Sequence, residues 1–124
     1  MKDITEHLTV MGSSKTQKRS SSKTPEGKVK QRVREVLQEF KAYTVMPATW
    51  GYGASGVPDF IVCYESIFIG IEVKSNKTSH PLTPLQQRNI QEIRRAGGYA
   101  LVVDESNIDE LRDLLTEIRD GQIT

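Results

Sequence analysis

Apolar and polar positions follow two different periods along the chain, and each change of period marks a new element. Over residues 25–42 apolar residues recur at intervals of three and four, which predicts an amphipathic helix. The apolar stripe of this helix is formed by Val29, Val33, Val36, Leu37 and Phe40. Thr24-Pro25-Glu26 supplies an N-cap, a first-turn proline and a first-turn acid, so we expect the helix to begin there.

Two runs rich in β-branched and aromatic residues predict strands at about 57–64 and 67–74. Only Glu65-Ser66 separates them, so we expect an antiparallel hairpin. Tyr43–Ala48 predicts a short strand before the hairpin, and Tyr99–Val103 predicts a further strand after it.

Two more helices are predicted after the hairpin. Thr83-Pro84 begins one that runs to about Ala96 and ends at Gly97-Gly98. Asn107–Arg119 forms the other, with apolar residues at helical spacing. The resulting order is α-β-β-β-α-β-α, which indicates an α/β fold.

The hairpin register brings two acids together. With a Glu65-Ser66 loop, opposed residues have numbers that sum to 131, so Asp59 faces Glu72. A four-residue loop over Tyr64–Ile67 is the alternative, and it leaves the register unchanged. Side chains alternate along a strand, so Lys74 shares the face of the two acids. The opposite, core-facing side is formed by Phe60, Val62, Tyr64, Ile67, Ile69, Ile71 and Val73.

Two carboxylates about 5 Å apart across a ladder repel each other unless a cation neutralises them. Paired carboxylate oxygens completed by water suit Mg²⁺ or Mn²⁺ better than Zn²⁺. Lys74 beside such a cation would orient a water or neutralise a phosphate, which is the chemistry of a phosphodiesterase. The alternative is an exposed sheet face with an ordinary acid–lysine pair.

Composition limits the fold to one modest core, because the chain has 124 residues of which 36% are hydrophobic. It contains no run of about 18 apolar residues, and its N-terminus lacks the order of a secretory signal. We therefore expect a soluble cytoplasmic protein without a membrane partner. Cys63 is the only cysteine, which excludes a disulfide framework, and we expect it in the core.

Charge is distributed unevenly although the net charge is only +1. Residues 13–41 hold nine Lys and Arg against three acids, whereas 104–120 hold seven acids against two Arg. We expect residues 1–24 to form a flexible basic N-terminal arm, followed by a single domain over 25–124. The side chains predicted to contact phosphate from the basic segment are Lys15, Lys18, Arg19, Lys23, Lys28 and Lys30. The alternative is a solvated basic face.

Two short motifs resemble those of a known nuclease superfamily. Gly56-Val57-Pro58-Asp59 followed by Glu72-Val73-Lys74 resembles the PD-(D/E)XK nucleases. With the helical Glu26 and Thr83-Pro84-Leu85-Gln86, residues 25–105 are similar to the virus-type replication-repair nuclease (VRR-NUC) domain. The resemblance implies a restriction-endonuclease-like core, which is a mixed β-sheet flanked by helices.

The resemblance also implies site roles. Asp59 and Glu72 would hold Mg²⁺ or Mn²⁺ together with the backbone carbonyl of Val73, and Lys74 would lie beside the attacking water. Glu26 would act through a metal-bound water, although a first-turn Glu also complements the helix dipole. Gln86 would reach the site, or would only complete a capping box with Thr83.

Other candidates lie in loops. Trp50 and Tyr52, in the glycine-rich stretch before Gly56, would stack on unpaired bases or cover the core. Lys77 is a candidate phosphate contact, and His80, without a partner at ligand spacing, is expected to be a solvated loop residue.

We therefore predict a metal-dependent DNA endonuclease that hydrolyses phosphodiesters in branched or junction DNA during replication or repair, in a bacterial or phage-infected cell. A chain of this size is expected to act as a homodimer. The alternatives are another PD-(D/E)XK nuclease, such as a Holliday junction resolvase or a restriction-type subunit, and a non-catalytic DNA-binding module of the same fold.

Overall fold

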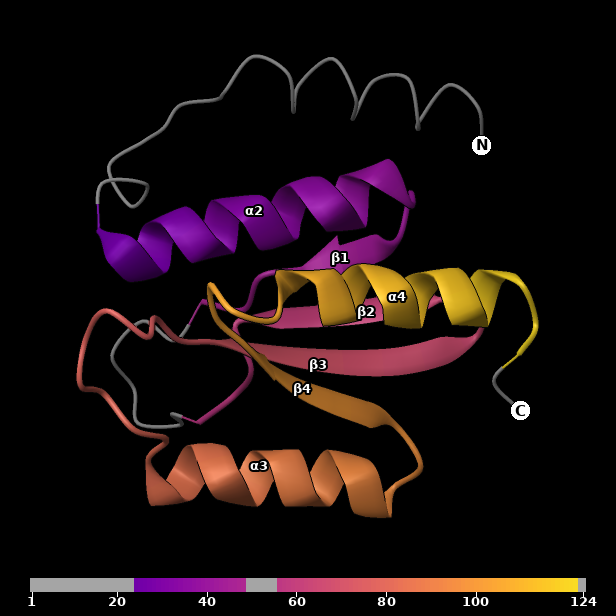
Figure 1. Cartoon of the computed structure of the whole chain (residues 1–124). Coiled ribbons are helices and arrows are strands. Elements are labelled where there is room, and N and C mark those ends of the chain that lie inside the picture. Colours follow the sequence, from indigo (N-terminus) through magenta and orange to yellow (C-terminus); the bar gives the residue numbers. More distant parts are fainter. Residues whose placement is uncertain (1–23, 49–55, 123–124) are drawn as a thin grey trace.

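A mixed β-sheet lies between two helices on one face and one helix on the other (Figure 1). The computed structural model describes residues 24–48 and 56–122. The helices are α2 (Pro25–Glu39), α3 (Pro84–Arg95) and α4 (Ile108–Arg119). The strands are β1 (Tyr43–Val45), β2 (Phe60–Tyr64), β3 (Ile67–Val73) and β4 (Tyr99–Val103). The predicted order α-β-β-β-α-β-α is confirmed.

The strands lie in the order β1-β2-β3-β4. The first two pairings are antiparallel, and β3 pairs with β4 in parallel, so the sheet is mixed as predicted. The parallel pair is connected through α3, which supplies the long crossover that such a pair requires. The β2–β3 register runs from Phe60 opposite Ile71 to Tyr64 opposite Ile67. Every pair sums to 131, which confirms the predicted register.

The hairpin turn has two residues, so the four-residue alternative is wrong. Glu65 and Ser66 have φ values of +50° and +70°. Two consecutive positive φ values define the primed turn whose twist matches the strands, although Gly or Asn usually occupies it. Tertiary packing of the two strands therefore outweighs the local preference of the turn.

Element ends differ from the predicted ranges for local reasons. Helix α2 ends at Glu39 rather than 42, because Lys41 takes a left-handed φ of +58° and ends the helical hydrogen bonding. Strand β2 begins at Phe60 rather than 57, since Pro58 has no N–H to offer a ladder. Strand β1 ends at Val45, two residues before Pro47.

The core lies between the sheet and the helices α2 and α4. All the residues predicted to face it are buried there, except that Ile67 is only partly buried against its edge. The apolar stripe of α2 and residues Leu111 and Leu115 of α4 close this core from the other side. An ion pair connects the two helices, in which Arg112 Nη1 lies 2.6 Å from both carboxylate oxygens of Glu39.

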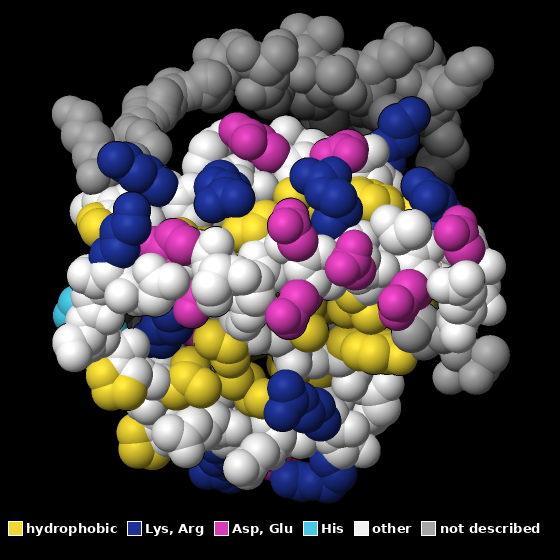
Figure 2. All heavy atoms as spheres, in the orientation of Figure 1, with side chains coloured by type: hydrophobic (Ala, Val, Ile, Leu, Met, Phe, Trp, Pro, Cys, Tyr) yellow, Lys and Arg dark blue, Asp and Glu magenta, His cyan; other side chains and the backbone are white. Residues whose placement is uncertain are grey.

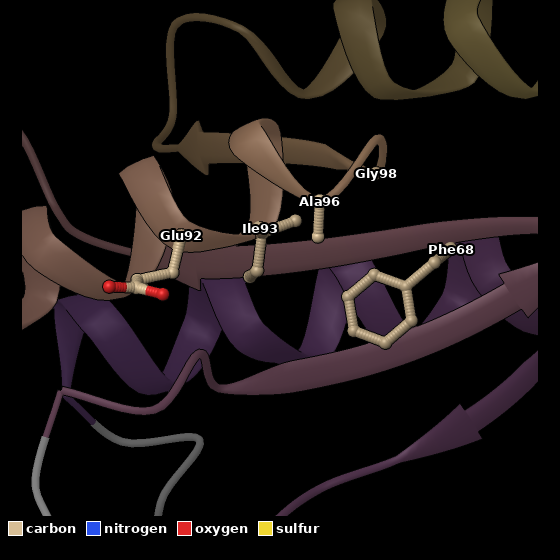
Figure 3. Close-up of a pocket in the computed structure, with 5 residues that line it drawn as sticks. All are labelled: Phe68, Glu92, Ile93, Ala96 and Gly98. Carbon is tan, nitrogen blue, oxygen red and sulfur yellow. The ribbon is translucent and has the colours of Figure 1, made fainter.

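The opposite sheet face is covered by α3 only over β3 and β4. Gly70 makes room there, because a Cβ on it would lie 2.7 Å from a methyl group of Ile93. Farther along β3, Phe68 is exposed and lines a pocket with Ile93 and other residues of the α3 C-terminal end (Figure 3). The prediction of a buried Cys63 is wrong: strand alternation places it on this face, beyond the cover of α3, where it is exposed.

Charged side chains follow the uneven distribution seen in the sequence. Figure 2 shows several acidic side chains gathered over α4. Of the helices in the described ranges, not one has the length and apolarity needed to cross a membrane.

Candidate active site

Asp59 lies immediately before β2, where the hairpin register continues for one more position. The last paired residues are Phe60 and Ile71, so Asp59 falls opposite Glu72. The Asp59 Oδ2 atom accepts a hydrogen bond of 2.8 Å from the Val73 backbone N–H. The side chain thus takes the place of a backbone acceptor, and this contact fixes the orientation of the carboxylate beside Glu72.

Glu72 is a buried acid, with only 4% of its surface exposed. Burial, together with the neighbouring Asp59 carboxylate, raises the pKa of Glu72 to about 8, while Lys74 opposes that shift. A buried carboxylate beside a second one needs a positive charge or a shared proton to be tolerated. The part of the sheet face that carries Glu72 is therefore not an ordinary exposed surface, because α3 covers it.

Gln86 makes both of the contacts that the sequence offered as alternatives, a capping box and a reach toward the acids. Its Oε1 atom accepts from the Thr83 backbone N–H, and its own backbone N–H donates to Thr83 Oγ1, which completes a capping box at the start of α3. Its Nε2 atom donates to Glu72 Oε2 at 2.9 Å. The cap therefore holds the amide in the orientation that reaches the site.

The donor set at this position fits a hard divalent cation. In an extended strand the N–H and C=O of one residue face the same neighbour, so the Val73 N–H bond to Asp59 places the Val73 carbonyl on the Asp59 side. Two carboxylates, this carbonyl and water are the oxygen ligands that suit Mg²⁺ or Mn²⁺. Across residues 24–48 and 56–122, no group of three or more His, Cys, Asp or Glu side chains is placed to hold a metal ion. A cation here would depend on the carbonyl and on water as well as on the two acids.

Lys74 follows Glu72 by two positions and is half-buried. It is close enough to oppose the rise in the pKa of Glu72. The next residue, Ser75, is buried and donates to Glu105 Oε2 at 2.5 Å, and the Asn76 N–H donates to Glu105 Oε1 at 2.7 Å. These bonds lower the pKa of Glu105, led by the one from Ser75. The backbone on either side of Lys74 is thus held in place, by strand β3 before it and by the bonds of Ser75 and Asn76 to Glu105 after it.

Glu26 and Lys30 approach the acids from α2. Lys30 Nζ lies 3.4 Å from Asp59 Oδ1 and 3.9 Å from Glu26 Oε2. Glu26 therefore lies at the edge of the site, as its position in the sequence suggested, and Lys30 lies between it and Asp59. The role of Lys30 beside the carboxylates was missed, although its spacing of four from Glu26 was a signal that they share a helix face. Ser75 and Glu105 were missed as well.

The remaining candidates are surface residues or lie outside the described residues. Lys28, Lys77 and His80 are exposed, as expected of phosphate contacts or solvated loop residues. Six predicted nucleic-acid contacts lie outside the described residues: Lys15, Lys18, Arg19, Lys23, Trp50 and Tyr52. Most of the predicted arm, residues 1–23, is outside them too.

Solved structures of the same architecture carry the VRR_NUC designation. One, described as "VRR_NUC domain", matches with a TM-score of 0.61 and 26% identity over 73% of this chain and 96% of its own. Another, described as "VRR_NUC domain protein", has a TM-score of 0.51 and 21% identity over 72% of this chain and 85% of its own. No family model and no curated protein matches the chain. The fold is VRR-NUC-like, with the restriction-endonuclease-like arrangement that the motifs implied.

Proposed function

We propose that this chain is a metal-dependent DNA endonuclease that hydrolyses phosphodiester bonds. The observation that carries the proposal is the pair formed by the buried Glu72 and the partly buried Asp59, held by Gln86 and Val73 on a fold shared with VRR_NUC domain structures. A stable domain gains nothing from burying a carboxylate beside another one, so such an arrangement is typical of a functional site.

The cation, when bound, would supply Lewis-acid activation of a water and would neutralise charge on the phosphate. Asp59, Glu72 and the Val73 carbonyl would hold it. The Gln86 amide donates a hydrogen bond to Glu72, and the Val73 N–H donates one to Asp59, so each carboxylate is oriented by a contact outside the cation. Lys74 has no oxygen or free lone pair to ligate a cation when charged, so its ammonium would contact the attacking water or a phosphate oxygen.

We further propose that the substrate is branched DNA and that the protein acts as a homodimer. Recognition of a branch requires two DNA arms to be held at once, and a symmetric pair of small domains presents two equivalent sites for them. The basic residues that precede and begin α2 would contribute phosphate contacts that carry no sequence information.

The test is cleavage of linear, flapped and four-way DNA of shared sequence by the purified full chain, with Mg²⁺, Mn²⁺ or a chelator. The matched controls are Asp59→Asn and Glu72→Gln, prepared in parallel, since both keep side-chain shape but remove the charge. We expect metal-dependent cleavage by the wild type, preference for the branched substrates, and no cleavage by either variant.

Cleavage that persists in both variants would show a different site or a contaminating nuclease, and the proposal would then be wrong. Binding of four-way DNA without any cleavage in either metal would indicate the non-catalytic DNA-binding alternative. Equal cleavage of all three substrates would support the nuclease activity but contradict the proposed preference for branched DNA. Sedimentation of the same samples measures whether the chain is a dimer.

A further inference from the structure

Lys30 is a second lysine at the carboxylate site, and it comes from a different element than Lys74. Its ammonium lies 3.4 Å from Asp59 Oδ1 and 3.9 Å from Glu26 Oε2. The side chains are only partly exposed, at 29% for Lys30 and 22% for Asp59. Lys30 is therefore held between two acids in a half-buried position, unlike an exposed surface ion pair with freedom to dissociate.

The two oxygen atoms of Asp59 have different neighbours. Oδ2 faces the Val73 N–H on the side of Glu72, whereas Oδ1 faces Lys30 on the side of Glu26. In two-metal nuclease sites a carboxylate bridges cations that lie about 3.5–4 Å apart. In this site the Glu72 side of Asp59 faces a second carboxylate, whereas the Glu26 side already holds the positive charge of Lys30.

Charge counting leads to the same arrangement. When all are ionised, Glu26, Asp59 and Glu72 carry three negative charges and Lys30 and Lys74 carry two positive ones, which leaves a net charge of −1. One divalent cation changes this to +1, and two would change it to +3 in a partly buried site. Without Lys30 the same residues would carry −2, which one divalent cation would neutralise and two would change to +2, a smaller excess of positive charge than the +3 reached with Lys30 present.

We propose that Lys30 is a built-in cation that occupies the place of a second metal ion, so that the site takes one divalent cation. This inference rests on the proposed function, because it assumes that Asp59 and Glu72 hold metal. Lys30 remains between Asp59 and Glu26 when that cation binds, and Glu26 serves to hold Lys30 in place.

The experiment is titration of the full chain with MnCl₂ alone, without DNA, followed by calorimetry and by electron paramagnetic resonance. The proteins are the wild type, Lys30→Met and Lys30→Gln, since either substitution removes the ammonium at a position that is not part of the core. The matched control is Arg32→Met, which removes one positive charge from an exposed position on the same helix. Circular dichroism verifies that each variant is folded.

We expect one Mn²⁺ per chain in the wild type and in Arg32→Met. We expect two Mn²⁺ per chain in Lys30→Met and Lys30→Gln, with the spectrum of two exchange-coupled ions. Two Mn²⁺ in the wild type would overturn the inference. So would one Mn²⁺ in both Lys30 variants, because Lys30 would then only compete for the first cation.

These outcomes are separate from failure of the proposed function. A wild type that binds one Mn²⁺ and cleaves DNA, while the Lys30 variants also bind one, overturns only the role of Lys30. A wild type that binds no Mn²⁺ overturns the metal-dependent site itself, and the inference about Lys30 with it.

Discussion

At the scale of single residues, each of the two acids at the site is oriented both by the backbone element that carries it and by a hydrogen bond to its carboxylate. Glu72 is held by its strand and by the Gln86 amide, and Asp59 is held by the hairpin and by the Val73 N–H. Because both acids are oriented before any cation arrives, little conformational entropy would be lost on binding it. This arrangement has an electrostatic cost, because burial of Glu72 beside Asp59 lowers the stability of the protein when no metal is bound.

That cost predicts a dependence of stability on pH. The pKa of Glu72 is raised from 4.5 to about 8 in the folded chain, so between these values the unfolded chain has released a proton that the folded chain keeps. Fewer protons on the unfolded chain mean that the free energy of unfolding falls as pH rises, by at most about 1.4 kcal/mol per pH unit from this group. Denaturant unfolding in metal-free buffer at pH 5 and pH 8 measures the effect. Between pH 5 and pH 8, Glu72→Gln should gain stability relative to the wild type. A difference in unfolding free energy between the two proteins that is the same at both pH values would contradict the raised pKa of Glu72.

Lys74 separates catalysis from metal binding. Lys74→Ala should keep affinity for DNA in Ca²⁺, because Asp59 and Glu72 remain, yet lose cleavage rate by about 10²-fold or more with the loss of a preorganised charge. Lys74→Arg should not restore the rate, since a planar guanidinium positions its charge differently. Single-turnover cleavage with excess enzyme is the measurement. A rate for Lys74→Ala near that of the wild type would reduce Lys74 to a screening charge.

At the scale of elements, the site depends on how closely α3 approaches the segment before β2. Gly56 has a φ of +91°, and a Cβ on it would lie 2.6 Å from the Leu85 backbone in the first turn of α3. Leu85 precedes Gln86, so this close approach sets the position of the residue that bonds to Glu72. Gly70, two residues before Glu72 on β3, allows a similar close approach of the Pro58 and Ile93 side chains to the strand.

Gly56→Ala should therefore destabilise the fold more than a positive φ alone would. Gly97→Ala is the matched control, because Gly97 has a φ of +100° and a Cβ added there would have nothing within 4 Å. We expect about 1–2 kcal/mol for the backbone strain in Gly97→Ala, and roughly 1–3 kcal/mol more for the overlap in Gly56→Ala. Denaturant midpoints measure both. Equal losses of stability would show that the segment around Gly56 moves away from α3 at little cost.

At the scale of the whole molecule, charge is divided between a basic N-terminal segment and an acidic C-terminal helix. Helix α4 places exposed acids at Asp109, Glu110, Asp113 and Glu117, whereas α2 carries Lys30 beside Asp59 and the exposed Lys28. A polyanion would be repelled by the first surface and attracted to the second. The orientation of DNA on the protein would follow from this division, with α4 turned away from it.

The basic residues before α2 should add affinity without changing the chemistry. Deleting residues 1–23 should weaken DNA binding and lower the slope of log affinity against log salt by about 0.9 for each phosphate that is no longer neutralised. Replacing Lys15, Lys18, Arg19 and Lys23 with Gln in the full-length chain is the matched variant, because it keeps the length. Both changes should leave the single-turnover rate at saturating protein unchanged. An unchanged salt slope would contradict the predicted binding of phosphates by these residues.

Much of the fold and half of the site followed from the sequence by local rules. The period of apolar residues, together with capping and turn residues, predicted every described element. A side-chain period of two made the pairing of Asp59 with Glu72 depend only on the hairpin loop having an even number of residues. These are short-range properties, since the two acids are 13 positions apart and one turn connects them. Cys63 shows the limit of the same rules, because alternation assigns a residue to a face but does not say how far a helix covers that face.

Only the tertiary structure decided which distant side chains surround the acids. The parallel pairing of β3 with β4 sets Val73 opposite Val103 and so brings Ser75 to Glu105, a register that no turn determines. The amide of Gln86 reaches Glu72 because α3 packs closely on the sheet. Lys30, which the helix itself places beside Glu26, reaches Asp59 because packing of the core fixes the position of α2 against the sheet. Each of these contacts depends on the packing of whole elements, and hydrophobic burial is non-directional, so the sequence pattern specifies which faces meet but not their offset.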